Sequence, residues 1–394
     1  MLLLPAGQKR ACVGYTGFSR QHNMPMSNLC IQISGSFPPK TCGIGDYTSH
    51  LVRRMRAAGA DVEVWTRATT PLGEHGRGLV SHWDAENMRT LGRALCSEKP
   101  GVVHLQYEPG VYDRHPAILR LPFLARRAGA GFVTTFHSLD GPAQWGRAHR
   151  LALLPLLLGS RDITVCSGRQ YHLLTRIPRL RDRVHLIPIG SNIDPLPFVP
   201  DAPSAGLRLV YFGFVWRGRN IELLLRALAA VRARDPQASL EIVGGLRDDA
   251  YHQELLHLAD QLGVGPDVLF SGDLEAPEVS QALRRADIAL LPYATGVSTG
   301  RGTLMAALAH GLPLVTFSVP DNLSPLFKHG ENMMLAPAGD EAQFISHTVA
   351  LTENAALRAQ VAAGAAALAP RFDWMQVARQ VLALPTYASA RANP

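Results

Sequence analysis

Three glycine-containing segments of the sequence combine residue types that bind phosphate groups. The first, SGSFPPKTCGIGDY at residues 34–47, follows a short apolar run and opens into a stretch with helical periodicity. Glycines between a strand and a helix let backbone N–H groups and the helix dipole face an anion. We expect Gly43, Ile44 and Gly45 to lie against a phosphate. The alternative is a plain strand-to-helix turn, because short glycine motifs are weak signals.

The second segment, FGFVWRGRNIELLL at residues 212–225, places two arginines just after an apolar run. A guanidinium group presents a fork of N–H donors that matches a diphosphate, and open α/β sheets bind ligands at the carboxyl ends of their strands. Arg217 and Arg219 are therefore predicted to bind a diphosphate. The alternative is a solvated rim of charge without a ligand.

The third segment, YATGVSTGRGTLMAALAHGLP at residues 293–313, leads from a loop into a helix rich in small residues. At the start of that helix, Arg301 adds a full positive charge to the helix dipole. This is the strongest phosphate site that the sequence predicts, and it comprises Gly300, Arg301, Gly302 and Thr303. The alanines that follow are expected to serve close helix packing.

Two further polar residues end apolar runs, at the edge where loops carry function. His137 closes FVTTFH, and Glu108 follows HLQY. We expect His137 to belong to the site, against the alternative of a structural histidine at a strand end. For Glu108 the alternative is a carboxylate at the rim of a hairpin. Because no Asp-x-Asp motif occurs, the sequence predicts no metal ion on a diphosphate and assigns its neutralisation to arginines and helix dipoles.

The composition is that of a packed globular enzyme, with 47% hydrophobic and 18% charged residues among 394. This length exceeds what one hydrophobic core organises, which predicts two domains. No apolar run reaches the roughly 18 to 20 residues of a membrane span. Five widely spaced cysteines lack metal-ligand spacing, so we expect reduced thiols and a cytoplasmic protein. The net charge of +7 favours a small anionic ligand, with an anionic membrane surface second; the basic stripe of a nucleic-acid binder is missing.

Short apolar runs alternate with helical stretches in two series, as in parallel sheets of doubly wound α/β domains. A proline-rich stretch at residues 194–203 separates the two series. The expected strands of the first series are residues 30–34, 62–66, 102–106, 132–136, 163–166 and 184–188. Those of the second series are residues 207–212, 240–243, 268–271, 288–291 and 314–317.

Ten motifs in order resemble the family 4 (group 1) glycosyltransferases of the GT-B fold. They are FPPKTCGIGDYTSHL, VVHLQYEPG, TTFHSLDGP, VHLIPIGSNI, YFGFVWRGRNIELLLRAL, LEIVGG, VLFSGDL, ADIALLPY, AALAHGLPLV and FDWMQVARQVL. The resemblance implies two Rossmann-like doubly wound parallel-sheet domains that face each other across a cleft. Residues 28–195 would form the acceptor-side domain, 196–370 the nucleotide-sugar domain, and 371–394 a helix crossing back to the first domain plus a tail. Residues 1–27 are expected to be a disordered leader.

The resemblance also implies roles for individual residues. The glycine loop at residues 43–45 would lie near the donor diphosphate, and His137 near the transferred sugar. Of the family's Arg and Lys pair, the lysine position holds Arg219 and the arginine position holds Trp216, with Arg217 beside it. Further donor-binding positions are Gly213, Gly272, Asp273, Ser298 and Thr299, and acceptor-side positions are Tyr107 and Glu108.

One departure from the family concerns two glutamates, seven residues between them, that contact the donor sugar and the ribose. Their positions hold Ser298 and Ala306 in this chain. The loss of a buried acceptor for a hydroxyl costs about 1–3 kcal/mol unless another group replaces it. We expect Arg301 and Thr303 to compensate in a rebuilt donor loop.

The leading interpretation is retaining, metal-independent transfer of a sugar from a nucleotide diphosphate sugar to a glycan, lipid-linked or small-molecule acceptor. No cofactor besides this donor substrate is expected, and the oligomeric state is left open. Peripheral contact with the inner face of a membrane is the second reading of the basic charge. Two alternatives remain: a nucleotide-sugar-binding partner subunit that has lost catalysis, and a GT-B phosphorylase or epimerase.

Overall fold

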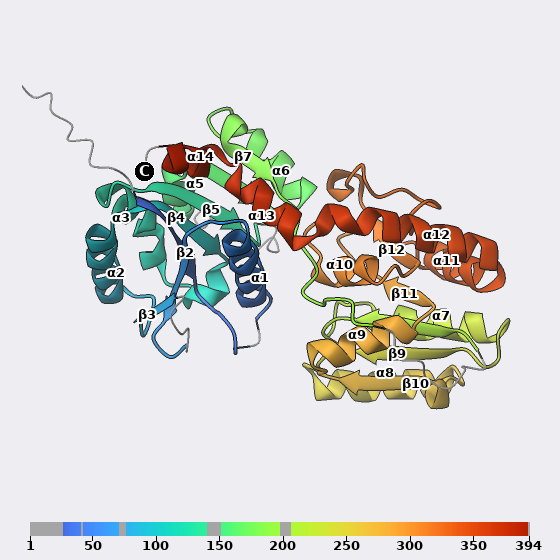
Figure 1. Ribbon diagram of the computed structural model, residues 1–394. Coiled ribbons are helices and arrows are strands. Elements are labelled where there is room, and N and C mark those ends of the chain that lie inside the picture. The colour runs from blue at the N-terminus through green and yellow to red at the C-terminus, as the bar shows by residue number, and fades with distance from the viewer. Residues whose placement is uncertain (1–26, 41, 71–75, 140–150, 198–205, 393–394) are drawn as a thin grey trace, which may run out of the picture.

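The computed structural model contains two α/β domains, each built on one parallel sheet (Figure 1). It describes residues 27–40, 42–70, 76–139, 151–197 and 206–392. The first sheet has seven strands in the order β3-β2-β1-β4-β5-β6-β7, and the second has six in the order β10-β9-β8-β11-β12-β13. Each sheet starts in its middle, is built to one edge and is then extended from the middle to the other. This is the doubly wound arrangement that the sequence predicts.

The first domain alternates strands and helices along the chain. Its strands are β1 (Ser27–Ser34), β2 (Val62–Arg67), β3 (Gly76–Val80), β4 (Pro100–Tyr107), β5 (Gly131–Phe136), β6 (Asp162–Val165) and β7 (Val184–Leu186). Its helices are α1 (Gly43–Ala57), α2 (Ala85–Glu98), η2 (Pro109–Tyr112), η3 (Pro116–Arg120), α3 (Leu121–Arg127), α5 (Leu154–Gly159), α6 (Gly168–Thr175) and η4 (Arg181–Arg183). Strand β4 is buried along its whole length, because helices cover both faces of the sheet.

The second domain repeats this alternation. Its strands are β8 (Arg208–Phe212), β9 (Ser239–Val243), β10 (Val268–Gly272), β11 (Ile288–Leu291), β12 (Leu314–Ser318) and β13 (Met334–Pro337). Its helices are α7 (Ile221–Arg232), α8 (Asp249–Gln261), η5 (Gly265–Asp267), α9 (Ala276–Arg285), α10 (Gly302–Ala309), η6 (Pro320–Asn322), α11 (Glu341–Glu353), α12 (Ala355–Leu368) and η7 (Ala369–Phe372). Two more helices, α13 (Trp374–Leu382) and α14 (Pro385–Ala392), end the chain.

Every strand expected from the sequence is present, and two strands were missed. Both missed strands, β3 and β13, lie at sheet edges. Strand β3 reads GRGLV, and its two glycines contribute no side chain to the apolar pattern. Strand β13 is four residues long and ends in a proline. Short edge strands with glycine or proline carry little of the signal on which a pattern-based prediction depends.

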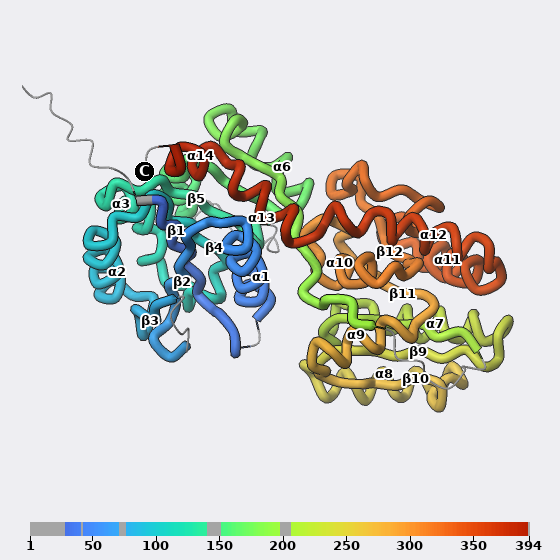
Figure 2. The backbone as a smooth tube through the Cα atoms, viewed as in Figure 1, coloured from blue at the N-terminus to red at the C-terminus, as the bar shows by residue number. Residues whose placement is uncertain are grey.

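The C-terminal helices α13 and α14 return from the second domain to cover the first. Helix α13 packs along α1, and α14 lies over β4 and β5. Their apolar side chains, among them Val381 and Tyr387, join Leu51 and Met55 of α1 in one buried cluster. Figure 2 shows this crossing as the red end of the tube. Of the predicted leader, only Ser27 lies within the described residues, where it begins β1.

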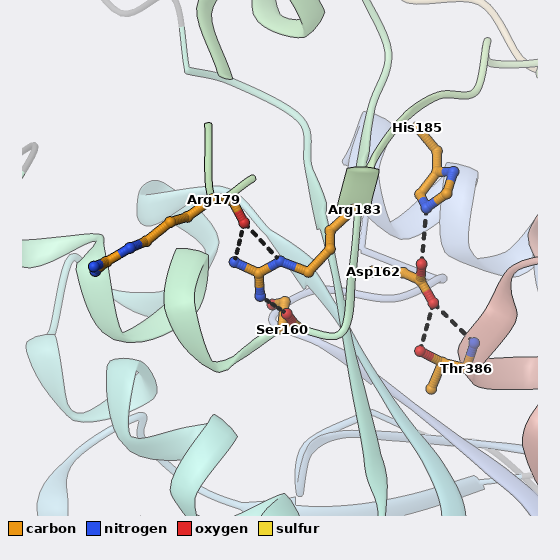
Figure 3. Close-up of polar contacts among 6 residues, drawn as sticks. All are labelled: Ser160, Asp162, Arg179, Arg183, His185 and Thr386. Atoms are coloured by element: carbon orange, nitrogen blue, oxygen red, sulfur yellow. Dashed lines mark hydrogen bonds and ion pairs between the residues drawn. The ribbon is translucent and has the colours of Figure 1, made fainter. Parts of the chain in front are cut away.

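A carboxylate fastens the last helix to the sheet (Figure 3). Asp162, whose side chain is 2% exposed, accepts hydrogen bonds from the backbone N–H of Thr386 at 2.8 Å and from Nε2 of His185 at 2.8 Å. Burial by itself raises the pKa of Asp162, but the hydrogen bonds from His185 and Thr386 outweigh it and lower that pKa. In the same view, Arg183 donates to the carbonyl oxygens of Arg179 and Ser160.

The return to the first domain passes a tight contact between a tryptophan and a glycine. The indole Nε1 of Trp374 donates to the carbonyl oxygen of Ser191 at 2.6 Å. A Cβ atom added to Gly190 would lie 2.7 Å from the Trp374 ring, closer than side-chain carbons approach one another. The connection between the domains therefore requires glycine at this position.

Candidate functional site

A cavity of about 470 Å³ lies between the two domains, at the carboxyl ends of their strands. His137 and Cys166 contribute from the first domain, and Tyr211 and Tyr293 from the second. Its size is within the range of small-molecule sites, and its position is where doubly wound sheets bind ligands. The domains thus bring together residues that are far apart in the sequence.

Three arginines line this cavity, and none of its described lining residues is a carboxylate. Arg169 comes from the start of α6, Arg219 from the turn after β8, and Arg301 from the residue before α10. Positive charge without a compensating carboxylate favours an anionic ligand. The N-terminus of α10 adds its dipole beside Arg301.

Aromatic rings hold two of the arginines in place. The guanidinium of Arg219 lies 5.4 Å from the ring centroid of Trp216, and that of Arg301 lies 4.9 Å from Tyr293. The Nε of Arg219 is buried and has no hydrogen-bond partner in the described structure. A buried donor without a partner is costly, so this nitrogen is available for a ligand oxygen.

Arg217 lies elsewhere, and here the position differs from the expectation. Its guanidinium makes two hydrogen bonds to Glu254, at 2.6 and 2.7 Å, and lies 3.4 Å from Asp248. This pairing raises the pKa of Arg217 above its ordinary value. Arg217 lines a separate surface hollow with Arg247 and Asp248 instead of the interdomain cavity. The structure therefore does not bring Arg217 together with Arg219.

The third predicted segment reaches the cavity and also joins the domains. Ser298, Gly300 and Arg301 line the cavity. Thr299 donates from Oγ1 to the carbonyl oxygen of Cys166 at 2.6 Å, across the domain boundary. Thr303 is bonded through its hydroxyl to the hydroxyl of Tyr293 at 2.6 Å, so it supports that ring and is not a lining residue. Gly302 is the first residue of α10.

The first predicted segment is set back from the cavity. Helix α1 begins at Gly43, and Gly45 packs on the backbone of Phe37, where a Cβ would lie 3.1 Å from Cα. Neither these glycines nor Ile44 line the cavity. The helix reaches the site through Tyr47, whose ring meets His137 edge-on with a centroid distance of 4.7 Å.

His137 forms part of the cavity wall, as predicted for a residue at the end of β5. Its Nε2 lies 3.0 Å from Oε1 of Gln106 on β4. Burial lowers the pKa of His137 to about 4, because a charged ring would lose its hydration. The imidazole is therefore neutral near pH 7.

The two acceptor-side positions and three further donor positions, Gly213, Gly272 and Asp273, do not line the cavity either. Glu108 caps η2 by accepting from the backbone N–H of Val111 at 3.1 Å. Tyr107 is 4% exposed, and burial raises its pKa to about 12. Asp273 packs beside Gly245, and Gly213 and Gly272 have φ angles of 152° and 68°. These residues shape the loops around the strand ends.

Arg169, Tyr211 and Asn322 line the cavity but were not predicted from the sequence. Asn322 is 5% exposed and donates from Nδ2 to the carbonyl oxygen of Thr295 at 3.2 Å, but its buried Oδ1 has no partner in the described structure. Arg169 follows a strand end in the pattern SGRQ, which is a signal comparable to that of Arg219. Asn322 carries no motif, because only the folded chain brings it to the cavity.

The two positions of the missing glutamates differ in the structure. Ser298 is 4% exposed and lines the cavity. Ala306 is fully buried in the apolar cluster of the second domain and is not among the lining residues. The cavity wall offers an unpaired acceptor on a different loop, Oδ1 of Asn322.

Two features are absent from the part of the chain that the structure describes. No group of three or more His, Cys, Asp or Glu side chains there is arranged to hold a metal ion. No described helix is long and apolar enough to cross a bilayer. Metal independence stays a prediction.

Comparison with known proteins agrees with this architecture. The family model "Glycosyl transferase 4-like domain" matches residues 42–190, and the model "Glycosyl transferases group 1" matches residues 206–354. Each model covers most of one sheet domain. The fold is GT-B, and the chain belongs to the group 1 glycosyltransferases of family 4.

Relatives with assigned names extend over most of the chain. It is 28% identical over 385 residues to the D-inositol 3-phosphate glycosyltransferase of Frankia alni, with 86% of this chain and 93% of the relative covered. It is 27% identical over 365 residues to the phosphatidyl-myo-inositol mannosyltransferase of Mycobacterium leprae, with 86% and 91% covered.

Solved structures share the fold at lower identity. Sucrose-phosphate synthase from Thermosynechococcus elongatus superposes with a TM-score of 0.72 at 18% identity, covering 93% of this chain and all of the other. The Anabaena protein HepE, in complex with UDP and glucose, superposes with a TM-score of 0.70 at 16% identity, covering 90% and 98%.

Proposed function

We propose that this glycosyltransferase binds a nucleotide diphosphate sugar in the interdomain cavity and transfers the sugar with retention of configuration. The observation that carries the proposal is the set of three lining arginines, Arg169, Arg219 and Arg301, with no described carboxylate among the lining residues. The bond between the anomeric carbon and the diphosphate breaks, and a bond to the acceptor oxygen forms on the same face. The acceptor proton passes to the leaving diphosphate, so no strong protein base is needed.

The arginines stabilise the charge that develops on the diphosphate. Arg219 offers its unpaired Nε, and Arg301 acts with the N-terminus of α10. Fixed positive groups aimed at a leaving group stabilise the transition state without reorganisation. The solved UDP complex of a protein with this fold supports a nucleotide donor, and the base and sugar are left to experiment.

Asn322 supplies the hydroxyl acceptor that the two missing glutamates would provide. Its buried Oδ1 has no partner, and its amide is anchored through Nδ2 to Thr295. A ribose or sugar hydroxyl donating to this oxygen would satisfy it. This replaces the expectation that Thr303 compensates, because the Thr303 hydroxyl is already bonded to Tyr293.

The acceptor is proposed to be lipid-linked and presented at an anionic membrane surface. On the outer side of α3 and α5, Phe123, Leu154 and Leu158 are 67%, 41% and 53% exposed. The two helices are in contact, since Gly159 packs on Pro122. From 121 to 186 the described acidic residues are Asp162 and Asp182, whereas the arginines are Arg126, Arg127, Arg161, Arg169, Arg176, Arg179, Arg181 and Arg183. Exposed apolar side chains within a segment that is rich in arginine and poor in acidic residues fit an anionic bilayer.

Vesicle binding tests this surface. The protein should sediment with phosphatidylglycerol vesicles and not with phosphatidylcholine vesicles. Combined Phe123→Ser and Leu158→Ser should abolish binding, whereas Leu269→Ser should not, because Leu269 is 58% exposed on the second domain. Absence of binding by the unchanged protein would overturn the membrane proposal, as would full binding by the double variant.

Turnover with defined donors tests the main proposal. Purified protein is incubated with UDP-, GDP- and dTDP-sugars and membrane lipid extract, and nucleotide release and anomeric product are measured. Sugar transfer with retention supports the proposal. Donor binding without transfer or hydrolysis under any acceptor mixture would instead favour the catalytically lapsed partner subunit, and an inverted product or a free epimerised donor would refute retaining transfer.

A further inference from the structure

A chain of buried hydrogen bonds begins at His137 in the cavity wall and crosses the first sheet. His137 Nε2 lies 3.0 Å from Gln106 Oε1, Gln106 Nε2 donates to Gln32 Oε1 at 2.8 Å, and Gln32 Nε2 donates to the hydroxyl of Tyr387 at 2.9 Å. Gln106 and Gln32 are fully buried on β4 and β1, and Tyr387 is 3% exposed on α14. The cavity wall is thus connected to the last helix of the chain.

The chain continues beyond Tyr387 to neighbouring strands. The Tyr387 hydroxyl lies 2.8 Å from Nδ1 of His104, and His104 Nε2 lies 2.7 Å from Oγ1 of Thr135. Both are fully buried, and burial lowers the pKa of His104 to about 3. His104 is therefore neutral and carries one ring proton, so one of its two nitrogens donates a hydrogen bond in this chain and the other accepts one.

A thioether favours one direction of this chain. The Nε2 of Gln32 lies 3.8 Å from Sδ of Met55, which has no hydrogen and can only accept. An amide NH₂ group is therefore favoured at this end of Gln32, and its oxygen must accept from Gln106. The Gln106 oxygen then faces His137, so the proton of that ring must lie on Nε2. Reversing the chain would require both amides to turn and would place an oxygen against sulfur.

We infer that Gln106, Gln32 and Tyr387 are positioning residues that hold His137 as the Nε2–H tautomer, so that its bare Nδ1 is a hydrogen-bond acceptor for a hydroxyl of the donor sugar. Nδ1 has no partner within the described residues, and the ring lines the cavity. The ligand part of this inference rests on the proposed function. The tautomer part does not, because it follows from the buried contacts alone.

Nuclear magnetic resonance of ¹⁵N-histidine-labelled protein without ligand reads the tautomer directly. The His137 signals are identified by their loss in His137→Asn. The unchanged protein should show a protonated Nε2 and a bare Nδ1. Gln106→Glu should give a ring protonated on both nitrogens, because the carboxylate accepts from Nε2 and stabilises the imidazolium. A protonated Nδ1 in the unchanged protein would overturn the inference.

Tyr387→Phe tests whether the last helix acts on the site. Without the Tyr387 hydroxyl, Gln32 Nε2 keeps only longer contacts, at 3.3 Å to Nδ1 of His104, 3.6 Å to Sγ of Cys30 and 3.8 Å to Sδ of Met55, so its amide can turn. The variant should therefore mix the two His137 tautomers and lower kcat about 5- to 10-fold, the effect of losing one buried hydrogen bond, with KM for the acceptor unchanged. Tyr112→Phe is the matched control, because the fully buried Tyr112 hydroxyl donates to the backbone carbonyl oxygens of Ile33 and Gln106 and is not hydrogen-bonded to the side chains that form the chain. Wild-type tautomers and kcat in Tyr387→Phe would overturn the coupling. A protein that shows the expected tautomer but transfers no sugar would contradict the proposed function alone.

Discussion

Arg219 and Arg217 are separated by one glycine, yet they should differ sharply in their effect on donor binding. Arg219 lines the cavity with an unpaired Nε, whereas Arg217 is bonded to Glu254 outside it. Replacement by methionine keeps the length of each side chain and removes its charge. Hydrogen bonds to a charged group contribute about 1.5–3 kcal/mol, which corresponds to roughly a 10- to 150-fold change in Kd.

We expect Arg219→Met to weaken binding of UDP, GDP or dTDP, whichever the protein prefers, by that factor. The same variant should unfold at nearly the same temperature as the unchanged protein, because the Nε of Arg219 has no hydrogen bond to lose and the variant gives up only the contact with the Trp216 ring among the interactions described for this side chain. Arg217→Met should leave nucleotide affinity within about twofold. Isothermal titration calorimetry and thermal denaturation measure both quantities on the same samples.

Similar nucleotide affinities of Arg219→Met and Arg217→Met would contradict the different positions assigned to the two arginines. Equal loss of affinity in both would mean that the ion pair with Glu254 opens to bring Arg217 to the ligand. Unchanged nucleotide affinity in Arg219→Met would show that this guanidinium does not bind the diphosphate, and the proposed stabilisation of the leaving group by Arg219 would be wrong.

Three further predictions concern the framework around the site. Gly190→Ala should lower the free energy of unfolding by about 1–3 kcal/mol, because the added methyl group meets the Trp374 ring. Chemical denaturation measures this loss, and an unchanged midpoint would contradict the contact. Below pH 6.5, His104 should lower the free energy of unfolding by up to about 1.4 kcal/mol per pH unit, because its folded pKa is about 3 and only the unfolded state takes up a proton in this range. His104→Gln should make the dependence of stability on pH less steep. An equally steep dependence in the variant would contradict this role of His104. Asp162→Asn should increase amide hydrogen exchange at Thr386 and in the rest of α14, because the carboxylate accepts that N–H; unchanged protection would contradict the role given to Asp162.

The fold could be predicted from the sequence because parallel strands buried on both faces leave continuous apolar runs. The edge strand β3 could not be predicted, because its two glycines interrupt the apolar run. At the site, Arg219, Arg301 and His137 could be found because each follows a strand or precedes a helix. Arg217 was misplaced because Gly218, with a φ angle of 89°, turns the chain between the two arginines.

Other parts of the site had no local signal. Asn322 reaches the cavity only because η6 of the second domain packs against α6 of the first. The partner of Gln32 on α14 is 355 residues away in the sequence. Contacts of this kind depend on how the domains and the C-terminus are folded back, which residue patterns within a short window do not encode.

The return of α13 and α14 has a consequence for how the protein is made. A ribosome releases the N-terminus first, and domains ordinarily fold in that order. Here the part of the first sheet around β4 and β5 lacks its covering helix, and Gln32 and His104 lack the Tyr387 hydroxyl, until α14 has been synthesised. The domain that is synthesised first is therefore completed only with α13 and α14, and removal of these two helices damages the domain that contains β1.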